Sequence, residues 1–302
     1  MSIRMNIIEL AIRLFGPKSF LEKSEDNFDK VLDRIEKNQE SKLNTNILKG
    51  NYLKIDSLDD QTIYRIKRDR LKKNKVIFFL FGGGFVSPPT NFDFKYIRFL
   101  LKYLDCEFIM PIYPLFPKKK LSQIVKFTYK AYSKILEEYD KEQIIFLGFS
   151  SGASLCLYLL NYMNMKRIKP EYPNLMILSS PAGELPPNQN ILKKMKELDS
   201  KDVILSPIFI SELSKRLAEP EYPKLESTLD HNLKDFPPIK LLYGEKEIFY
   251  SYLPSFKKAE SKYNMNIEYI IGKNMPHCWP IILNTPEGKE ITKKIINIID
   301  RS

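Results

Sequence analysis

At 302 residues, with 43% hydrophobic and 28% charged residues, the chain has the length and composition of a soluble globular protein with a sizeable core. Its net charge of +11 comes from scattered lysines, with small clusters at 72–75 and 118–120. Because no helix-turn-helix, RNP or zinc-finger signature accompanies them, we predict a solvated basic surface and no nucleic-acid partner.

The first predicted element is an amphipathic helix in the stretch MNIIELAIRLF (5–15), where Glu9 and Arg13 interrupt the apolar residues. The stretch is therefore neither a membrane span nor a signal-peptide core, and we expect a cytoplasmic protein without integral membrane association. The three cysteines are far apart, and no H-E-x-x-H pattern occurs among the two histidines. We therefore predict no disulfide framework, no metal site and no cofactor.

Apolar runs and helical segments then alternate along the chain. The runs that predict strands are 62–68, 75–81, 107–113, 143–148, 174–180, 239–244 and 267–272. Helical patterns occupy 92–104, 121–139, 151–163 and 290–300. Several of the runs are apolar throughout, as strands covered on both faces must be. This order predicts an α/β fold with a mostly parallel sheet and helices on both faces.

Two regions do not follow that alternation. Residues 1–45 are helical in pattern, and residues 183–235 consist of helix and loop. Ligands of open α/β sheets bind outside the carboxyl ends of the strands, so we expect both regions to form a helical cap over a core of 46–182 and 236–302. The alternative is that they are peripheral helices.

The sequence GFSSG (148–152) follows the apolar run 143–148 and precedes a helical segment. A serine in a sharp strand-to-helix turn has strained backbone and an exposed hydroxyl, and the helix N-terminus favours developing negative charge. We therefore interpret Ser150 as a nucleophile. A serine N-cap in an ordinary turn is the alternative.

A glycine triplet in FGGGF (81–85) follows another predicted strand, although the chain has only 11 glycines. Clustered backbone N–H groups at such a loop can stabilise the oxyanion of acyl transfer. A nucleotide-phosphate loop is the rival interpretation, but the stretch has neither the G-K-[ST] nor the G-x-G-x-x-G pattern.

A base and an acid follow in the chain order that this chemistry requires, Ser, then Asp or Glu, then His. Glu245 and Glu247 come after the run 239–244, and His277 comes after the run 267–272. His231 is out of order and is interpreted as a surface or cap residue. We expect the side chain of Cys278 to point away from the site and to pack as a small thiol.

These motifs together resemble the hormone-sensitive-lipase-like family of α/β-hydrolases, the carboxylesterases with an HGGG motif. FGGGF stands in place of HGGGF, and GFSSGASL resembles the nucleophile turn. PIYPLFPKKKLSQ, DVILSPIF, DFPPIKLLYGEKEIF and MPHCW resemble further family stretches. The likeness runs from about residue 75 to residue 285 and implies an α/β-hydrolase fold with a cap.

Carried over residue by residue, the resemblance implies Ser150 as nucleophile, His277 as base and Glu247 as acid, with Glu245 as runner-up. The same match implies that the backbone N–H groups of Gly83, Gly84 and Ser151 form the oxyanion hole. The sequence departs from the family at three further positions. Phe81 replaces the histidine of the glycine motif, Phe149 replaces an aspartate, and Lys118 stands where glutamate is usual.

The sequence therefore predicts a carboxylesterase-type serine hydrolase that acts on small-molecule esters with a short or medium acyl chain. Three alternatives are a ligand-binding relative without turnover, an amidase and an interfacial lipase. The natural substrate is not readable from the sequence. The oligomeric state is open as well, with a homodimer as one alternative.

Overall fold

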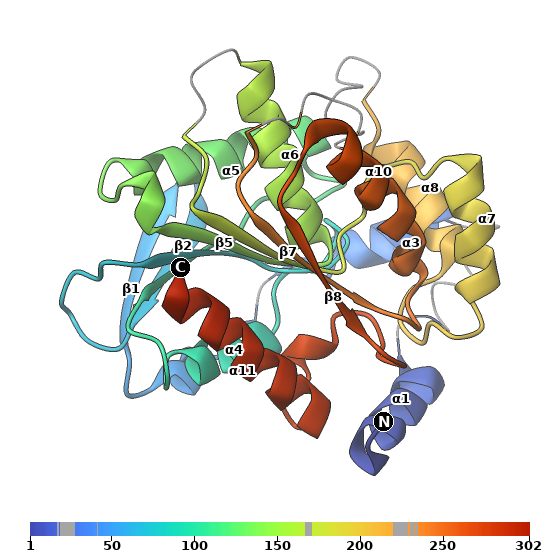
Figure 1. Ribbon diagram of the computed structural model, residues 1–302, viewed down its shortest axis with the longest axis horizontal. Coiled ribbons are helices and arrows are strands. Elements are labelled where there is room, and N and C mark those ends of the chain that lie inside the picture. Colours follow the sequence, from blue (N-terminus) through green and yellow to red (C-terminus); the bar gives the residue numbers. More distant parts are fainter. Residues whose placement is uncertain are drawn as a thin grey trace.

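The computed structural model describes residues 1–16, 18, 28–40, 42–166, 171–219, 229, 233 and 235–302. Its centre is an eight-stranded sheet with strand order β1-β2-β4-β3-β5-β6-β7-β8 (Figure 1). The strands are β1 (Tyr52–Leu58), β2 (Gln61–Lys67), β3 (Val76–Leu80), β4 (Glu107–Pro111), β5 (Ile144–Phe149), β6 (Leu175–Ser179), β7 (Ile239–Gly244) and β8 (Ile267–Gly272). The predicted strands are thus confirmed as β2 to β8.

The sheet is parallel from β4 to β8 and antiparallel only where β1 pairs with β2 and β2 pairs with β4. The sequence did not predict β1. No residue of this edge strand is fully buried, so it lacks the apolar run by which the others were found. Asp59 and Asp60 form the turn to β2 in left-handed conformation, with φ of 48° and 61°.

The four central strands, β3 to β6, are buried at every residue. Helices cover both of their faces, as the continuous apolar runs require. On one face lie α5 (Leu121–Leu136), α6 (Ser151–Met165) and α10 (Leu253–Tyr263); on the other lie α4 (Asn91–Leu100) and α11 (Pro286–Arg301) (Figure 1). The predicted three-layer α/β architecture is confirmed.

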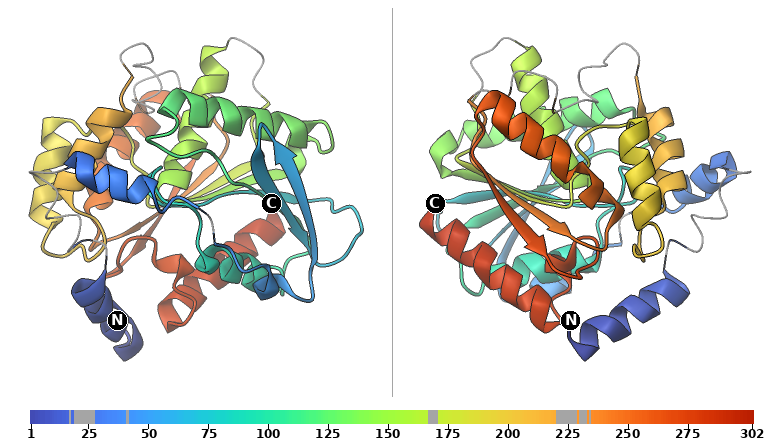
Figure 2. Two further views of the ribbon diagram at one scale, coloured as in Figure 1. Left: turned by 180° about the vertical axis from the view of Figure 1, so that it is seen from behind. Right: turned by 45° about the vertical axis from the view of Figure 1, so that its right-hand side comes forward.

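The remaining α-helices lie outside these layers. They are α1 (Ile3–Phe15), α3 (Phe28–Glu36), α7 (Gln189–Leu198) and α8 (Pro207–Leu217). Helices α3, α7 and α8 gather at one end of the sheet, while α1 lies by itself near the start of α11 (Figure 2). The rings of Phe28 on α3 and Phe209 on α8 pack 5.5 Å apart, so the two irregular regions of the sequence meet in space.

Short 3-10 helices complete the fold: η2 (Thr45–Leu48), η3 (Lys141–Gln143), η4 (Ile248–Tyr252) and η5 (Trp279–Ile281). Among the helices of the described residues, none has both the length and the apolar character needed to cross a membrane.

Candidate active site

Ser150 lies in the sharp turn between β5 and α6. Its backbone has φ 50° and ψ −121°, a conformation that a side-chain-bearing residue adopts only at a cost in free energy. A hydrogen bond of 2.8 Å from the Ser150 N–H to the Ser179 carbonyl holds the turn. A Cβ at Gly152 would lie 2.1 Å from the Leu80 carbonyl oxygen, so this position admits only glycine. The local packing therefore fixes the Ser150 hydroxyl at the carboxyl end of the sheet.

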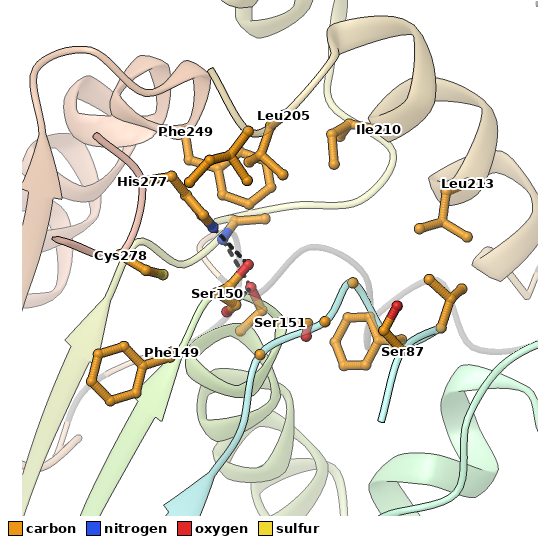
Figure 3. Close-up of a pocket in the computed structure, with 18 of the residues that line it drawn as sticks. Ser87, Phe149, Ser150, Ser151, Leu205, Ile210, Leu213, Phe249, His277 and Cys278 are labelled. Carbon is orange, nitrogen blue, oxygen red and sulfur yellow. Dashed lines mark hydrogen bonds between the residues drawn. The ribbon is translucent and has the colours of Figure 1, made fainter. Parts of the chain in front are cut away.

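His277 and Glu247 complete a hydrogen-bonded chain with Ser150. The His277 Nε2 is 2.9 Å from the Ser150 Oγ (Figure 3). Its Nδ1 is 2.5 Å from Glu247 Oε2. His277 comes from the loop after β8 and Glu247 from the loop after β7, and both side chains are buried. This arrangement allows the imidazole to accept the serine proton while the carboxylate fixes its tautomer.

Glu245, the runner-up for the acid, points elsewhere. The Glu245 carboxylate accepts a hydrogen bond of 3.0 Å from the backbone N–H of Asn274, and this hydrogen bond is exposed. Glu247 instead turns inward, and its second oxygen accepts a hydrogen bond of 3.0 Å from the backbone N–H of Gly244. The structure thus brings Glu247, and not Glu245, together with His277.

Two polar residues that the sequence did not single out lie beside Glu247 or hold its loop. The Ser180 hydroxyl faces the Glu247 carboxylate and accepts a hydrogen bond of 3.1 Å from the backbone N–H of Cys278. The buried Asp202 accepts a hydrogen bond of 2.8 Å from the backbone N–H of Ile248. Both residues therefore hold the loops that carry Glu247 and His277.

Burial and charge act in opposite directions on this pair. Burial raises the pKa of the Glu247 carboxyl, while His277 and the Ser180 hydroxyl act to lower it. Burial lowers the pKa of His277, but Cys278 and Glu247 at the ring outweigh it and hold the pKa of His277 well above 6.5. The charge of the Glu247 carboxylate therefore favours the protonated imidazole, the form that develops when His277 accepts the serine proton.

The glycine triplet runs along the Ser150 turn. Gly83 and Gly84 have φ of 125° and 63°, and a Cβ at Gly83 would lie 2.5 Å from the Ser87 carbonyl oxygen. A Cβ at Gly82 would lie 3.3 Å from the Ser150 Cβ, which places the loop against the nucleophile turn. Ser151 is the first residue of α6, where backbone N–H groups have no partner within the helix. The three predicted donors therefore lie on the two segments that meet at Ser150.

A cavity of about 690 Å³ adjoins Ser150 and His277. Apolar side chains of three helices outside the sheet layers line it: Ile12 of α1, Ile35 of α3, and Phe209, Ile210 and Leu213 of α8. Figure 3 shows two of them, Ile210 and Leu213. A mostly apolar cavity of this size, with polar groups at one end, is typical of a small-molecule site.

Cys278 also lines this cavity, so the prediction that its side chain points away is wrong. The residue has a left-handed backbone, with φ 53°, which breaks the alternation of side chains expected in an extended loop. The Cys278 thiol is free and half-buried, and Sγ lies 3.8 Å from the Ser179 carbonyl oxygen.

No group of three or more metal-ligating side chains occurs within the described residues. His231, interpreted from the sequence as a surface or cap residue, lies outside the described residues.

Comparison with known proteins agrees with this fold. A family model described as the α/β hydrolase fold matches residues 77–281. The chain belongs to the α/β-hydrolase fold family. An acetyl esterase of Salmonella schwarzengrund (strain CVM19633) is 29% identical over 99 residues. That match covers 31% of this chain and 31% of the relative, so the chain spans about a third of the curated relative it matches.

Solved structures share the fold over nearly the whole chain. A putative esterase from Staphylococcus aureus is 22% identical with a TM-score of 0.77, covering 92% of this chain and 93% of the other. An esterase of the bacterial hormone-sensitive lipase family is 17% identical with a TM-score of 0.79, covering 100% and 98%. EstE5 soaked with p-nitrophenyl butyrate is 18% identical with a TM-score of 0.79, covering 99% and 98%. The resemblance drawn from the motifs is confirmed.

Two of the departures from the family motifs are aromatic and buried in this α/β hydrolase. Phe81 stacks on Tyr113, with ring centroids 4.1 Å apart, and its carbonyl accepts a hydrogen bond of 2.7 Å from the Tyr113 hydroxyl. Phe149 packs edge-on against Tyr96, with centroids 5.1 Å apart. The glycine loop and the nucleophile turn are thus anchored by aromatic packing where the family pattern has polar side chains.

Proposed function

We propose that this α/β hydrolase is a serine hydrolase that cleaves small carboxylic esters with a short or medium acyl chain. The observation that carries the proposal is the strained Ser150, whose Oγ lies 2.9 Å from His277 Nε2 beside an apolar cavity. The names of the similar proteins, an acetyl esterase and EstE5 soaked with p-nitrophenyl butyrate, support the same class of substrate.

In the first half of the reaction, the Ser150 Oγ attacks the ester carbonyl carbon while His277 Nε2 takes the hydroxyl proton. The carbonyl oxygen becomes an anion, which the backbone N–H groups of Gly83, Gly84 and Ser151 stabilise. His277 then gives its proton to the leaving alcohol oxygen as the carbon–oxygen bond breaks. The product of this half is an acyl ester on Ser150.

In the second half, His277 takes a proton from a water molecule that attacks the acyl carbon. The tetrahedral intermediate collapses to the free carboxylic acid, and the proton returns to the Ser150 oxygen. Throughout, Glu247 fixes the tautomer of His277 and stabilises the imidazolium that forms in each half.

We assign residues 1–45 and 183–235 to a cap over a core of 46–182 and 236–302. This assignment is supported by the cavity lining that α1, α3 and α8 supply and by the packing of Phe28 on Phe209. In this arrangement the cap helices determine how long an acyl chain the cavity accepts.

The first experiment is hydrolysis of p-nitrophenyl esters from acetate to palmitate. The wild type should peak at a short or medium chain, and Ser150→Ala should lower kcat/KM by at least about 10⁴-fold. His277→Ala should cause a similar loss. His231→Ala, a change in the other of the two histidines, is the matched control and should retain wild-type turnover.

Labelling with a fluorophosphonate separates this proposal from a relative that binds ligands without turnover. The wild type should form one covalent adduct, located on Ser150, and Ser150→Ala should form none. A folded wild-type protein that neither hydrolyses any ester of the series nor reacts with the probe would overturn the proposed activity.

A further inference from the structure

Helix α1 exposes a stripe of large apolar side chains. Ile3, Ile7, Leu10 and Leu14 are 57–78% exposed and recur at the spacing that places them on one face of a helix. Half of the large hydrophobic residues that are exposed in the described chain belong to residues 1–14. An apolar stripe concentrated in this way marks an interaction surface. Figure 1 shows α1 at the edge of the molecule, away from the sheet.

The opposite side of α1 is fixed to the body of the protein. Met5 is fully buried, and Glu9 pairs with Lys246 at 2.8 Å. At the start of the helix, the Ser2 hydroxyl donates a hydrogen bond of 2.8 Å to Glu287 of α11. Because these contacts use the inner side of the helix, the apolar stripe points outward. The helix that carries it is held in place without a partner molecule.

The charges beside the stripe have one sign. Arg4 and Arg13 are exposed and lie on its two flanks, and the guanidinium of Arg13 also reaches the Ser200 carbonyl at 3.2 Å. Glu9, the one acidic residue of α1, is on the inner side and is paired with Lys246. The outward face of the helix is therefore apolar in the middle and cationic at both edges.

We propose that this face of α1 docks the protein onto an anionic lipid surface. A helix with an apolar face and cationic flanks lies in the interface of a bilayer, with its apolar side chains in the acyl boundary and its arginines at the headgroups. The net charge of +11 adds attraction to the same surface. A second copy of the chain fits this face less well, because the outward face of α1 carries no acidic side chain to pair with the arginines of the other copy.

The same helix faces the cavity. Ile12, on the inner side of α1, lines the 690 Å³ cavity beside Ser150. Docking through the outer face of α1 would therefore place a wall of this cavity directly behind the lipid contact. The docking itself does not depend on the proposed ester hydrolysis, since it is a property of the helix surface.

The test is co-sedimentation of the full chain with vesicles of pure phosphatidylcholine and of equal parts phosphatidylglycerol and phosphatidylcholine. We expect the wild type to bind the anionic vesicles at least about tenfold more tightly than the neutral ones, and less tightly as salt is raised. Ile7→Glu should weaken binding to the anionic vesicles by at least about tenfold.

Leu71→Glu is the matched control, because Leu71 is 70% exposed and does not belong to α1. Like Ile7→Glu, it replaces an exposed apolar side chain with a negative charge. It should bind within about twofold of the wild type. Circular dichroism shows whether each variant is folded, and sedimentation velocity reports the oligomeric state. Wild-type protein without preference for anionic vesicles, or equal losses in the two variants, would overturn the proposal. A dimer that Ile7→Glu dissociates, with no vesicle binding, would overturn it in favour of a second copy.

Discussion

Tyr113 lies flat on the ring of Phe81, with an angle of 5° between the planes, while its hydroxyl donates a hydrogen bond to the Phe81 carbonyl. One side chain thus holds both the ring and the backbone of the residue that begins the glycine loop. The segment after Tyr113 adds a second clamp, because the Phe116 N–H donates a hydrogen bond of 2.8 Å to the Phe85 carbonyl. The loop that carries the proposed oxyanion donors is therefore held from both ends.

Tyr113→Phe tests this clamp, since it keeps the stacked ring and removes only the hydroxyl. We expect a loss of about 1–3 kcal/mol in the free energy of unfolding, because the buried Phe81 carbonyl loses its partner. We also expect a lower kcat on a p-nitrophenyl ester. Tyr132→Phe is the control: its hydroxyl also donates to a backbone carbonyl, that of Glu171, and its loss should leave kcat unchanged. Equal kcat values in the two variants would contradict a role for the clamp in catalysis.

Gly83→Ala should damage activity more than stability. A Cβ at Gly83 meets the Ser87 carbonyl oxygen and the backbone has φ 125°, whereas a Cβ at Gly50, with φ 94°, meets nothing within 4 Å. Both alanine variants should lose about 1–2 kcal/mol of stability from backbone strain, and Gly83→Ala should lose more, because its Cβ would also lie 2.5 Å from a backbone oxygen. Only Gly83→Ala should displace an oxyanion donor and lower kcat by about 100-fold. Urea unfolding and ester hydrolysis of the two variants, compared side by side, separate these effects.

The sequence predicts the central sheet well because its strands are continuous apolar runs with little alternative to burial. It does not predict β1, where Lys54, Asp56 and Ser57 interrupt the apolar residues and no position is fully buried. Helix α10 is missed for a similar reason, because only two of its eleven residues, Phe256 and Ala259, are buried. Edge elements bury little surface, so they leave a weak pattern in the sequence.

The site is predictable where chain order and local turn chemistry constrain it, as for Ser150 and His277. The choice between Glu245 and Glu247 depends on which carboxylate turns inward at the start of η4. Both residues lie in the same loop, so their positions in the sequence do not show which one turns inward. Ser180 and Asp202 leave no recognisable signal, since serine and aspartate are common in turns. Their role becomes visible only when the ends of β6, β7 and β8 and the segment between α7 and α8 are seen side by side.

Glu247→Gln should shift the pH profile of activity and also lower the activity itself. His277 must be neutral to accept the Ser150 proton, so kcat/KM should fall as the pH drops through the His277 pKa, which lies above 6.5 in the wild type. Removing the Glu247 charge should lower that pKa and shift the acid limb to lower pH. The rate at the optimum should fall by about 10³- to 10⁴-fold.

The control for this change is Glu245→Gln, which makes the same substitution two residues away on a carboxylate bonded to Asn274. Its pH profile should match the wild type. A shift of the acid limb in Glu245→Gln, with none in Glu247→Gln, would reverse the assignment of the acid.

Leu213→Trp should shorten the acyl chain that the protein accepts. Leu213 lines the cavity from α8, and its Cδ2 is 3.7 Å from the point that a Cβ at Gly84 would occupy. A larger ring at this position fills space next to the glycine loop, so the ratio of kcat/KM for octanoate over acetate esters should fall at least about tenfold. Leu213→Ala should raise the ratio. Ile55→Trp on the exposed edge strand β1 should leave it unchanged; an equal shift there would rule out Leu213 as a determinant of chain length.

Asp93, which is not one of the proposed catalytic residues, should make the free energy of unfolding depend on pH. The side chain is buried at the start of α4, and burial raises its pKa to about 6 despite hydrogen bonds from the Thr90 N–H and hydroxyl. The unfolded chain has the ordinary value of 3.8, so between these two values the native protein binds more protons than the unfolded chain. Stability should therefore fall as the pH rises through this window.

Asp93→Asn removes this titration. From pH 4 to pH 7, the wild type should lose about 2.4 kcal/mol more unfolding free energy than Asp93→Asn. Urea unfolding of both proteins at the two pH values measures the difference, and groups that titrate in both cancel. The exposed Asp60→Asn in the β1–β2 turn should follow the wild type, because its carboxylate is in solvent in the folded protein as well. A wild type and an Asp93→Asn variant with the same pH dependence would show that Asp93 remains ionised in its buried position.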